Sequence, residues 1–188
     1  VTALADGGFV IAWYTTDPTQ DGSSGAIKAQ IYNASGSRVG GEFLVNPQAT
    51  NAQLAPVVTA LPNGGFVVVW ETIDAAQDGS GMAVKGQYFD SSGQPIGGEF
   101  LVNSLTSGAQ FLPAVATLAD GTLLVAWTSE SGDGNGYAVR GRTFDMASGP
   151  EIVSNGGGDA ASIAVAEGET AVTAVVAGGR GSPALGLP

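Results

Sequence analysis

The sequence contains no cysteine and no histidine. The absence of cysteine excludes disulfides, thiol catalysis and thiolate metal sites. The absence of histidine removes the side chain most often used as a general base and a common zinc ligand. Ser-His-Asp and Cys-His catalytic mechanisms are therefore excluded.

Basic residues and long apolar runs are also scarce. Six Lys and Arg stand against 17 Asp and Glu, so the formal net charge is −11. A field of that sign repels phosphate backbones and anionic membrane surfaces. No apolar run approaches the roughly 20 residues of a membrane-spanning helix. We therefore predict no nucleic-acid partner and no membrane insertion.

One ten-residue segment is present three times. It reads "LADGGFVIAW" at 4–13, "LPNGGFVVVW" at 61–70 and "LADGTLLVAW" at 118–127, so that its final Trp recurs every 57 residues at Trp13, Trp70 and Trp127. The segment "GGEFLVN" at 40–46 returns unchanged at 97–103. Repetition at a fixed period is typical of repeat architectures. With 30 Gly and 9 Pro, the chain is too rich in helix breakers for long helices, and we predict an all-β repeat protein.

The second copy shows the strand pattern of a module most clearly. Apolar runs bounded by turn residues predict four antiparallel strands, which in the second copy lie at 56–61, 66–72, 83–89 and 99–103. Asn63-Gly64 between the first two strands predicts a primed hairpin turn, in which both central residues have positive φ. Asp6-Gly7 and Asp120-Gly121 hold the same place in the other copies. Each module is therefore predicted to be a four-stranded meander.

The second strand of the module indicates how the modules stack. In "FVVVW" the residues Phe66, Val68 and Trp70 alternate with Val67 and Val69, so both faces of the strand are apolar. A strand that is apolar on both faces belongs to a sheet covered on both sides. The predicted fold is all-β, with tandem four-stranded antiparallel modules stacked as β-propeller-like blades, either as a partial propeller or as an open array. The alternation also favours core packing of the three Trp residues over stacking on sugars.

The period divides the chain into four parts. Repeat 1 spans 1–52 and starts inside a module, without the "AQxxP" lead-in of the later copies; repeat 2 spans 53–109, repeat 3 spans 110–155, and 156–188 is a linker with a further segment. We therefore expect that the chain is a piece of a longer protein and that further blades of the same parent chain are its partners.

The order of these motifs resembles a known family. Gln, Pro, "DGGFVVxW", an Asp-Gly-rich loop, Phe-Asp and "EFLVN" follow one another over about residues 1–155. This order resembles repeats of very large bacterial secreted or surface proteins, which often also carry cadherin-like domains and haemolysin-type calcium repeats and are commonly exported by type I secretion. Residues 161–177 resemble the opening of a cadherin-like domain, but 178–188 depart from that pattern, so no calcium site is carried over. The resemblance implies an extracellular or cell-surface location.

The loop after the second strand is the candidate metal site. Two carboxylates occur in each copy of this loop, namely Asp17 and Asp21, Asp74 and Asp78, and Glu130 and Asp133. Carboxylates and the carbonyls of Gly-rich backbone are hard oxygen ligands of the kind that Ca²⁺ takes. Two carboxylates per loop are few for calcium, and Asp-Gly and Ser-Gly also suit a solvated hairpin loop. Calcium binding and a plain solvated loop both stay open.

Two classes of function are compatible with these features. The first is a non-catalytic structural or adhesive repeat region of a large exported protein, with or without bound calcium, and with a carbohydrate or a cell-surface protein as its partner. The alternative is a fragment of a carbohydrate-active β-propeller enzyme or lectin. Equivalent modules favour the first class, and we predict no catalytic residues. The cations of the third strand, Lys28, Lys85 and Arg140, are expected at a solvated edge with their stems lying over the blade.

Overall fold

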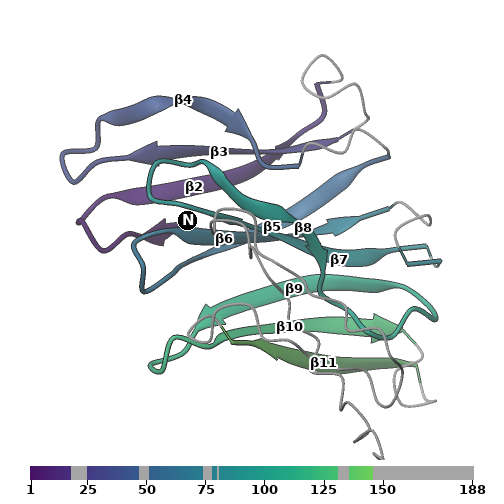
Figure 1. Cartoon of the computed structure of the whole chain (residues 1–188). Coiled ribbons are helices and arrows are strands. Elements are labelled where there is room, and N and C mark those ends of the chain that lie inside the picture. Colours follow the sequence, from purple (N-terminus) through teal and green to yellow (C-terminus); the bar gives the residue numbers. More distant parts are fainter. Residues whose placement is uncertain (18–24, 47–50, 74–77, 80, 131–135, 146–188) are drawn as a thin grey trace, which may run out of the picture.

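The computed structural model describes residues 1–17, 25–46, 51–73, 78–79, 81–130 and 136–145. These residues form three antiparallel sheets and no helix, which confirms the all-β class (Figure 1). The eleven strands are β1 Thr2–Ala3, β2 Phe9–Thr15, β3 Ala26–Tyr32, β4 Arg38–Leu44, β5 Gln53–Ala60, β6 Phe66–Thr72, β7 Ala83–Phe89, β8 Pro95–Leu101, β9 Gln110–Thr117, β10 Leu123–Glu130 and β11 Tyr137–Phe144. No helix in the described part of the chain could therefore cross a membrane.

Each sheet is a meander built from one continuous stretch of chain. The first two sheets have the orders β1-β2-β3-β4 and β5-β6-β7-β8, and the third has three described strands in the order β11-β10-β9. We call the three sheets with their loops modules 1, 2 and 3. In Figure 1 they lie one above another, with module 2 in the middle. The predicted four-stranded meander is confirmed in modules 1 and 2.

The middle strand of module 2 is covered on both faces. Phe66, Val68 and Trp70 pack in a cluster with residues of module 1, while Val67 and Val69 pack in a second cluster with residues of module 3. Every residue of β6 is buried. The predicted alternation is therefore confirmed, and it places the two halves of the core on either side of this one sheet.

The hairpin turns differ from the prediction. The primed turn needs positive φ at both central residues, but among Asp6, Asn63 and Asp120 none has positive φ, whereas the glycine after each does, as at Gly64 with φ 87°. The Leu61 amide donates to the Gly65 carbonyl at 2.9 Å, and the Gly64 amide donates to the Leu61 carbonyl at 3.1 Å. This is a three-residue loop that ends in a left-handed glycine. The side chain of Asn63 fixes it by accepting a hydrogen bond from the Gly65 amide at 3.0 Å.

The starts of two strands in module 2 also need correction. β5 starts at Gln53, three residues earlier than expected, because a bulge between Leu54 and Val57 lets the strand pass Pro56. β8 starts at Pro95, four residues earlier than expected, because the turn closes already at Gln94, whose carbonyl accepts from the Asp90 amide at 2.9 Å. Gly97 has φ 65° and lies in a bulge inside this strand rather than in the turn.

Candidate functional site

The carboxylates predicted to bind calcium are described only in part. Asp17, Asp78 and Glu130 are described, whereas Asp21, Asp74 and Asp133 lie outside the described residues. Within the described ranges, no group of three or more Asp, Glu, His or Cys side chains is placed where it could hold a metal ion. Because half of the predicted ligands are outside those ranges, calcium binding stays a prediction.

Two of the described candidate carboxylates, Asp78 and Glu130, accept hydrogen bonds from the protein itself. Asp78 Oδ2 accepts a hydrogen bond from Asn103 Nδ2 at 2.8 Å, and Asn103 Oδ1 accepts one from the Val84 amide at 2.8 Å. Glu130 Oε2 accepts a hydrogen bond from the Ala109 amide at 3.1 Å. Asp78 thus attaches its loop, and Glu130 attaches the end of β10, to a neighbouring segment of chain.

The conserved spacing of the repeats places a Trp beside a buried Gln. Trp70 Nε1 donates to Gln53 Oε1, and Trp127 Nε1 donates to Gln110 Oε1, each at 2.8 Å. All four side chains are buried, so their burial confirms core packing for these two Trp residues. A buried indole N–H that lacked such an acceptor would be costly. The Gln of the "AQxxP" segment is therefore a core residue.

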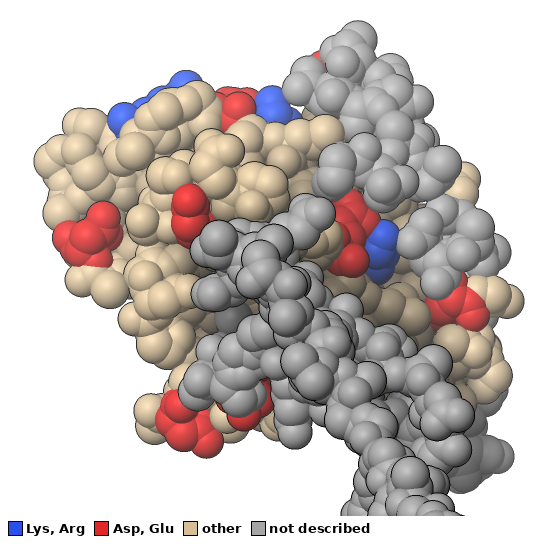
Figure 2. All heavy atoms as spheres, in the orientation of Figure 1, with Lys and Arg blue, Asp and Glu red and all other residues tan. Residues whose placement is uncertain are grey.

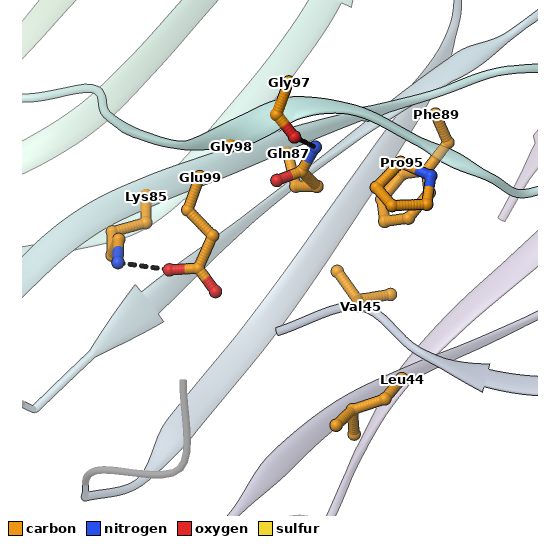
Figure 3. Close-up of a pocket in the computed structure, with 9 residues that line it drawn as sticks. All are labelled: Leu44, Val45, Lys85, Gln87, Phe89, Pro95, Gly97, Gly98 and Glu99. Carbon is orange, nitrogen blue, oxygen red and sulfur yellow. Dashed lines mark hydrogen bonds and ion pairs between the residues drawn. The ribbon is translucent and has the colours of Figure 1, made fainter. Parts of the chain in front are cut away.

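A pocket of about 380 Å³ lies at the junction of modules 1 and 2. We call it the junction pocket. Module 1 contributes the end of β4 and the residue after it, and module 2 contributes β7 and β8 (Figure 3). Its lining is Leu44, Val45, Lys85, Gln87, Phe89, Pro95, Gly97, Gly98 and Glu99. The pocket is therefore built by two modules together.

An ion pair lies in the wall of the junction pocket. Lys85 Nζ donates to Glu99 Oε2, and the two side chains are only 10% and 7% exposed. The solvated position expected for Lys85 is therefore wrong, because module 1 covers this part of the strand. Glu99 Oε1 is buried and has no hydrogen-bond partner in the part of the chain that the structure describes. In Figure 3 this oxygen points away from Lys85, toward the side of the pocket that holds Val45.

The side chain of Gln87 is fixed beside this pair. Its Nε2 donates to the backbone carbonyls of Tyr88, Ile96 and Gly97 at 2.9–3.1 Å. These bonds hold the amide nitrogen against the bulge in β8. The amide oxygen lies on the side away from Gly97 (Figure 3). Gln87 and Glu99 thus both bring acceptor atoms to the pocket wall.

Module 1 holds the same ion pair in a different setting. Lys28 Nζ donates to Glu42 Oε2 at 2.7 Å, and the Glu42 side chain is 38% exposed. The hydrogen bond and charge of Lys28 lower the pKa of Glu42 below its ordinary value. The residue type and spacing are those of Lys85 and Glu99, so the burial of Glu99 comes from the neighbouring module and not from the motif.

On the face drawn in Figure 2, the described acidic residues do not gather at one place. In the view of Figure 2, Asp and Glu lie in separate spots between larger uncharged areas, and the few Lys and Arg lie among them. Among the described residues of this face, no strongly charged patch marks a binding surface. The junction pocket is therefore the candidate site that the described geometry favours.

The junction pocket was not predicted from the sequence, although Glu99 stands in a repeated motif. Glu99 belongs to the "GGEFLVN" segment, which predicted a strand and nothing more. The sequence did offer one signal, namely a glutamate directly before the apolar segment Phe-Leu-Val at the same place in two copies. Its alternation with Phe100 could have shown that one face of this strand carries a carboxylate.

Comparison with known proteins identifies no family. No protein-family model and no curated protein matches the chain. Among solved structures, the endo-arabinase from Bacteroides thetaiotaomicron VPI-5482 is similar, with 14% identity and a TM-score of 0.39 over 63% of this chain. The match covers 47% of the enzyme, so the chain spans less than half of its length. A likeness at this level establishes neither a shared fold nor a shared activity.

Proposed function

We propose that the chain is a non-catalytic structural repeat region of a large exported protein, in which the modules stack as β-propeller-like blades or as an open array. The observation that carries this proposal is the recurrence of polar contacts from one module to the next. The bonds Trp70–Gln53 and Trp127–Gln110 have the same length, atoms and spacing. Polar contacts that recur in every such module stabilise the fold of the module. An active site, by contrast, would use polar residues that occur in one module.

The Asn residue that follows the fourth strand in modules 1 and 2 supports the same proposal. Asn46 Oδ1 accepts a hydrogen bond from the Ile27 amide at 2.6 Å, and Asn103 Oδ1 accepts one from the Val84 amide at 2.8 Å. Both Asn side chains are buried. Since the final residue of "GGEFLVN" connects the end of the fourth strand to the third in each copy, this motif is explained by structure.

Glu71, a carboxylate that occurs in module 2 alone, also has a structural role. Glu71 is replaced by Tyr14 and Thr128 at the matching positions, so it is the kind of residue that an enzyme would add to one blade. Its Oε1 accepts a hydrogen bond from the Leu112 amide at 2.6 Å, and the residue is 6% exposed. Glu71 therefore joins module 2 to module 3, and this contact favours the scaffold over a carbohydrate-active enzyme.

Export, surface location, calcium binding and adhesion to a carbohydrate or cell-surface protein belong to the proposal through the sequence resemblance. Among the described strands, contacts between sheets join neighbouring modules, as β2 with β5 and β5 with β9. This stacking suits a spacer, because further copies can extend the array.

Insertion of an extra module tests the proposal. A second copy of residues 53–109 is inserted after residue 109, and urea unfolding of the two chains is compared. If the modules are interchangeable structural units, the longer chain folds and its m-value rises by roughly a third, because m grows with the surface exposed on unfolding. A chain that aggregates, or that unfolds with an unchanged m-value, would contradict the proposal. Hydrolysis of soluble polysaccharides by the original chain would favour the enzyme instead.

A further inference from the structure

The strongest unexplained feature of the molecule is the second carboxylate oxygen of Glu99. The Glu99 side chain is 7% exposed, and its Oε1 atom has no hydrogen-bond partner among the described residues. A buried acceptor that lacks a donor costs on the order of 1–3 kcal/mol, and more when it is charged. Glu99 lines the junction pocket, and Oε1 points toward the Val45 side of it (Figure 3). The surface of this oxygen is covered, so a donor in the pocket reaches it when the carboxylate turns toward the ligand.

The pocket is larger than one water molecule needs. Its volume of about 380 Å³ compares with a share of roughly 30 Å³ for one molecule of liquid water. It falls at the lower end of the range of about 300–1,000 Å³ that is typical of small-molecule sites. The space therefore suits a compact organic ligand of about one ring.

The charges in the wall favour a neutral ligand. Lys85 and Glu99 form an ion pair, so the described lining carries one positive and one negative charge. A cation near Glu99 Oε1 would also lie near the Lys85 ammonium, and an anion near Lys85 would also lie near Glu99. Either ion meets a like charge at short range, where repulsion is strong.

The remaining wall is apolar on one side and rich in acceptors on the other. Leu44, Val45, Phe89 and Pro95 provide hydrocarbon surface. Glu99 Oε1 has no donor in the described part of the chain, and the nitrogen of Gln87 is bonded to backbone carbonyls. The acceptors call for hydroxyl groups, and the apolar wall calls for C–H groups on the other face of the same molecule. A sugar ring has both.

We propose that the junction pocket binds a small, neutral, hydroxyl-rich ligand, namely a single sugar ring, which donates a hydroxyl hydrogen bond to Glu99 Oε1. Module 1 completes the site, because Leu44 and Val45 form its opposite wall. The pair Lys28–Glu42 has the same residues in module 1, but the Glu42 side chain is 38% exposed. It therefore provides a matched control within the same chain.

The test is an NMR titration of the full-length ¹⁵N-labelled chain with D-glucose, D-galactose, L-arabinose and D-xylose in turn. We expect saturable shifts of the Gly97, Gly98 and Glu99 amides for at least one of these sugars, with a Kd in the millimolar range. Glu99→Gln should raise that Kd by about tenfold or more, because a neutral amide is the weaker acceptor. Glu42→Gln should leave it unchanged.

A second variant covers the case in which Glu99→Gln loses its fold because the buried ion pair with Lys85 is lost. Leu44→Phe enlarges the half-buried wall on the module 1 side and keeps the ion pair, so it should weaken binding while the rest of the spectrum stays folded. The proposal is overturned if no sugar gives saturable shifts, or if both pocket variants bind as well as the original chain. It is equally overturned if glucuronate or glucosamine binds where the neutral sugars do not, or if Glu42→Gln weakens binding as much as Glu99→Gln.

Discussion

Modules 1 and 2 share the same motifs at matching positions, yet these positions differ in burial. Trp70 is 0% exposed and lies in a core shared with module 1, whereas Trp13, its counterpart, is only half-buried. Glu99 is buried in the wall of a pocket, and Glu42 is partly exposed. The face of module 2 that carries Trp70 and Glu99 is covered by module 1, whereas no described module covers the matching face of module 1. A residue therefore becomes core or surface according to its neighbour.

The largest expected difference between the modules is at the repeated Trp. Trp70→Ala should reduce the free energy of unfolding by about 3–5 kcal/mol, because it leaves a cavity in a fully buried cluster and frees the acceptor of Gln53. Trp13→Ala should cost about 1–2 kcal/mol, because less buried surface is lost. Urea unfolding of the full chain measures both. Equal losses would mean that the two positions are packed alike in solution.

The calcium prediction gives the next largest effect. A ligand that binds only the folded chain stabilises it by about 2.7 kcal/mol at a hundred times its Kd. Calcium should therefore raise the thermal midpoint above that measured in chelator, and Asp21→Asn with Asp78→Asn should abolish the rise. Asp6→Asn, in a hairpin turn, is the control and should keep it.

Asp78 needs its own comparison, because its Oδ2 accepts from Asn103. Asp78→Asn is therefore also measured in chelator, so that loss of this bond is separated from loss of calcium. A midpoint that does not respond to calcium in the original chain would reduce these loops to solvated turns.

A smaller change in the free energy of unfolding is expected at the hairpin between the first two strands, where modules 2 and 3 differ in the residue that follows the turn. A Cβ at Gly65 would lie 2.2 Å from the Phe89 carbonyl oxygen, which is backbone and cannot move without the strand. Module 3 has Thr122 at this place. Gly65→Thr should cost about 1–3 kcal/mol by overpacking, and Thr122→Gly about 0.5–1 kcal/mol through the added chain entropy. If both substitutions reduced the free energy of unfolding by a similarly small amount, the backbone of β7 at Phe89 would have moved to make room for the new side chain.

The features that depend on local pattern were predictable from the sequence. The 57-residue period located the sheets, and the alternation Phe66, Val68, Trp70 against Val67, Val69 assigned each residue to the correct side of β6. These predictions succeed because side-chain direction along a strand has a fixed period of two.

The features that depend on backbone detail or on the neighbouring module were not predictable. Asn63-Gly64 predicted a primed hairpin turn, and only the backbone conformation and hydrogen bonds show the three-residue loop that forms instead. Gly97 could end a turn or form a bulge, and the position of Gln94 decides between these. The burial of Lys85 arises from a module that is distant in sequence. The junction pocket needs two such modules, and no motif within a single repeat contains it.

The smallest expected difference concerns the third-to-fourth strand turns, where Asp90 in module 2 takes the place of Asn33 in module 1. Both Oδ1 atoms accept hydrogen bonds from two backbone amides, those of Ser92 and Gln94 for Asp90. Partial burial raises the pKa of Asp90, but hydrogen bonds from the Ser92 hydroxyl and the turn amides outweigh it and hold the pKa below its ordinary value. The carboxylate therefore adds stability above the unfolded pKa of about 3.9, and this stability is lost as the pH falls through the lower folded value.

Asp90→Asn should change the free energy of unfolding little at neutral pH, because Asn33 makes the same bonds with an amide oxygen. Below about pH 4 the variant should lose less stability than the original chain. Asn33→Asp should do the opposite and add acid sensitivity to module 1. Urea unfolding at neutral and acid pH compares the three chains. If all three lose stability equally on acidification, the two turns are not distinguished by charge, and the difference between the modules lies in their packing alone.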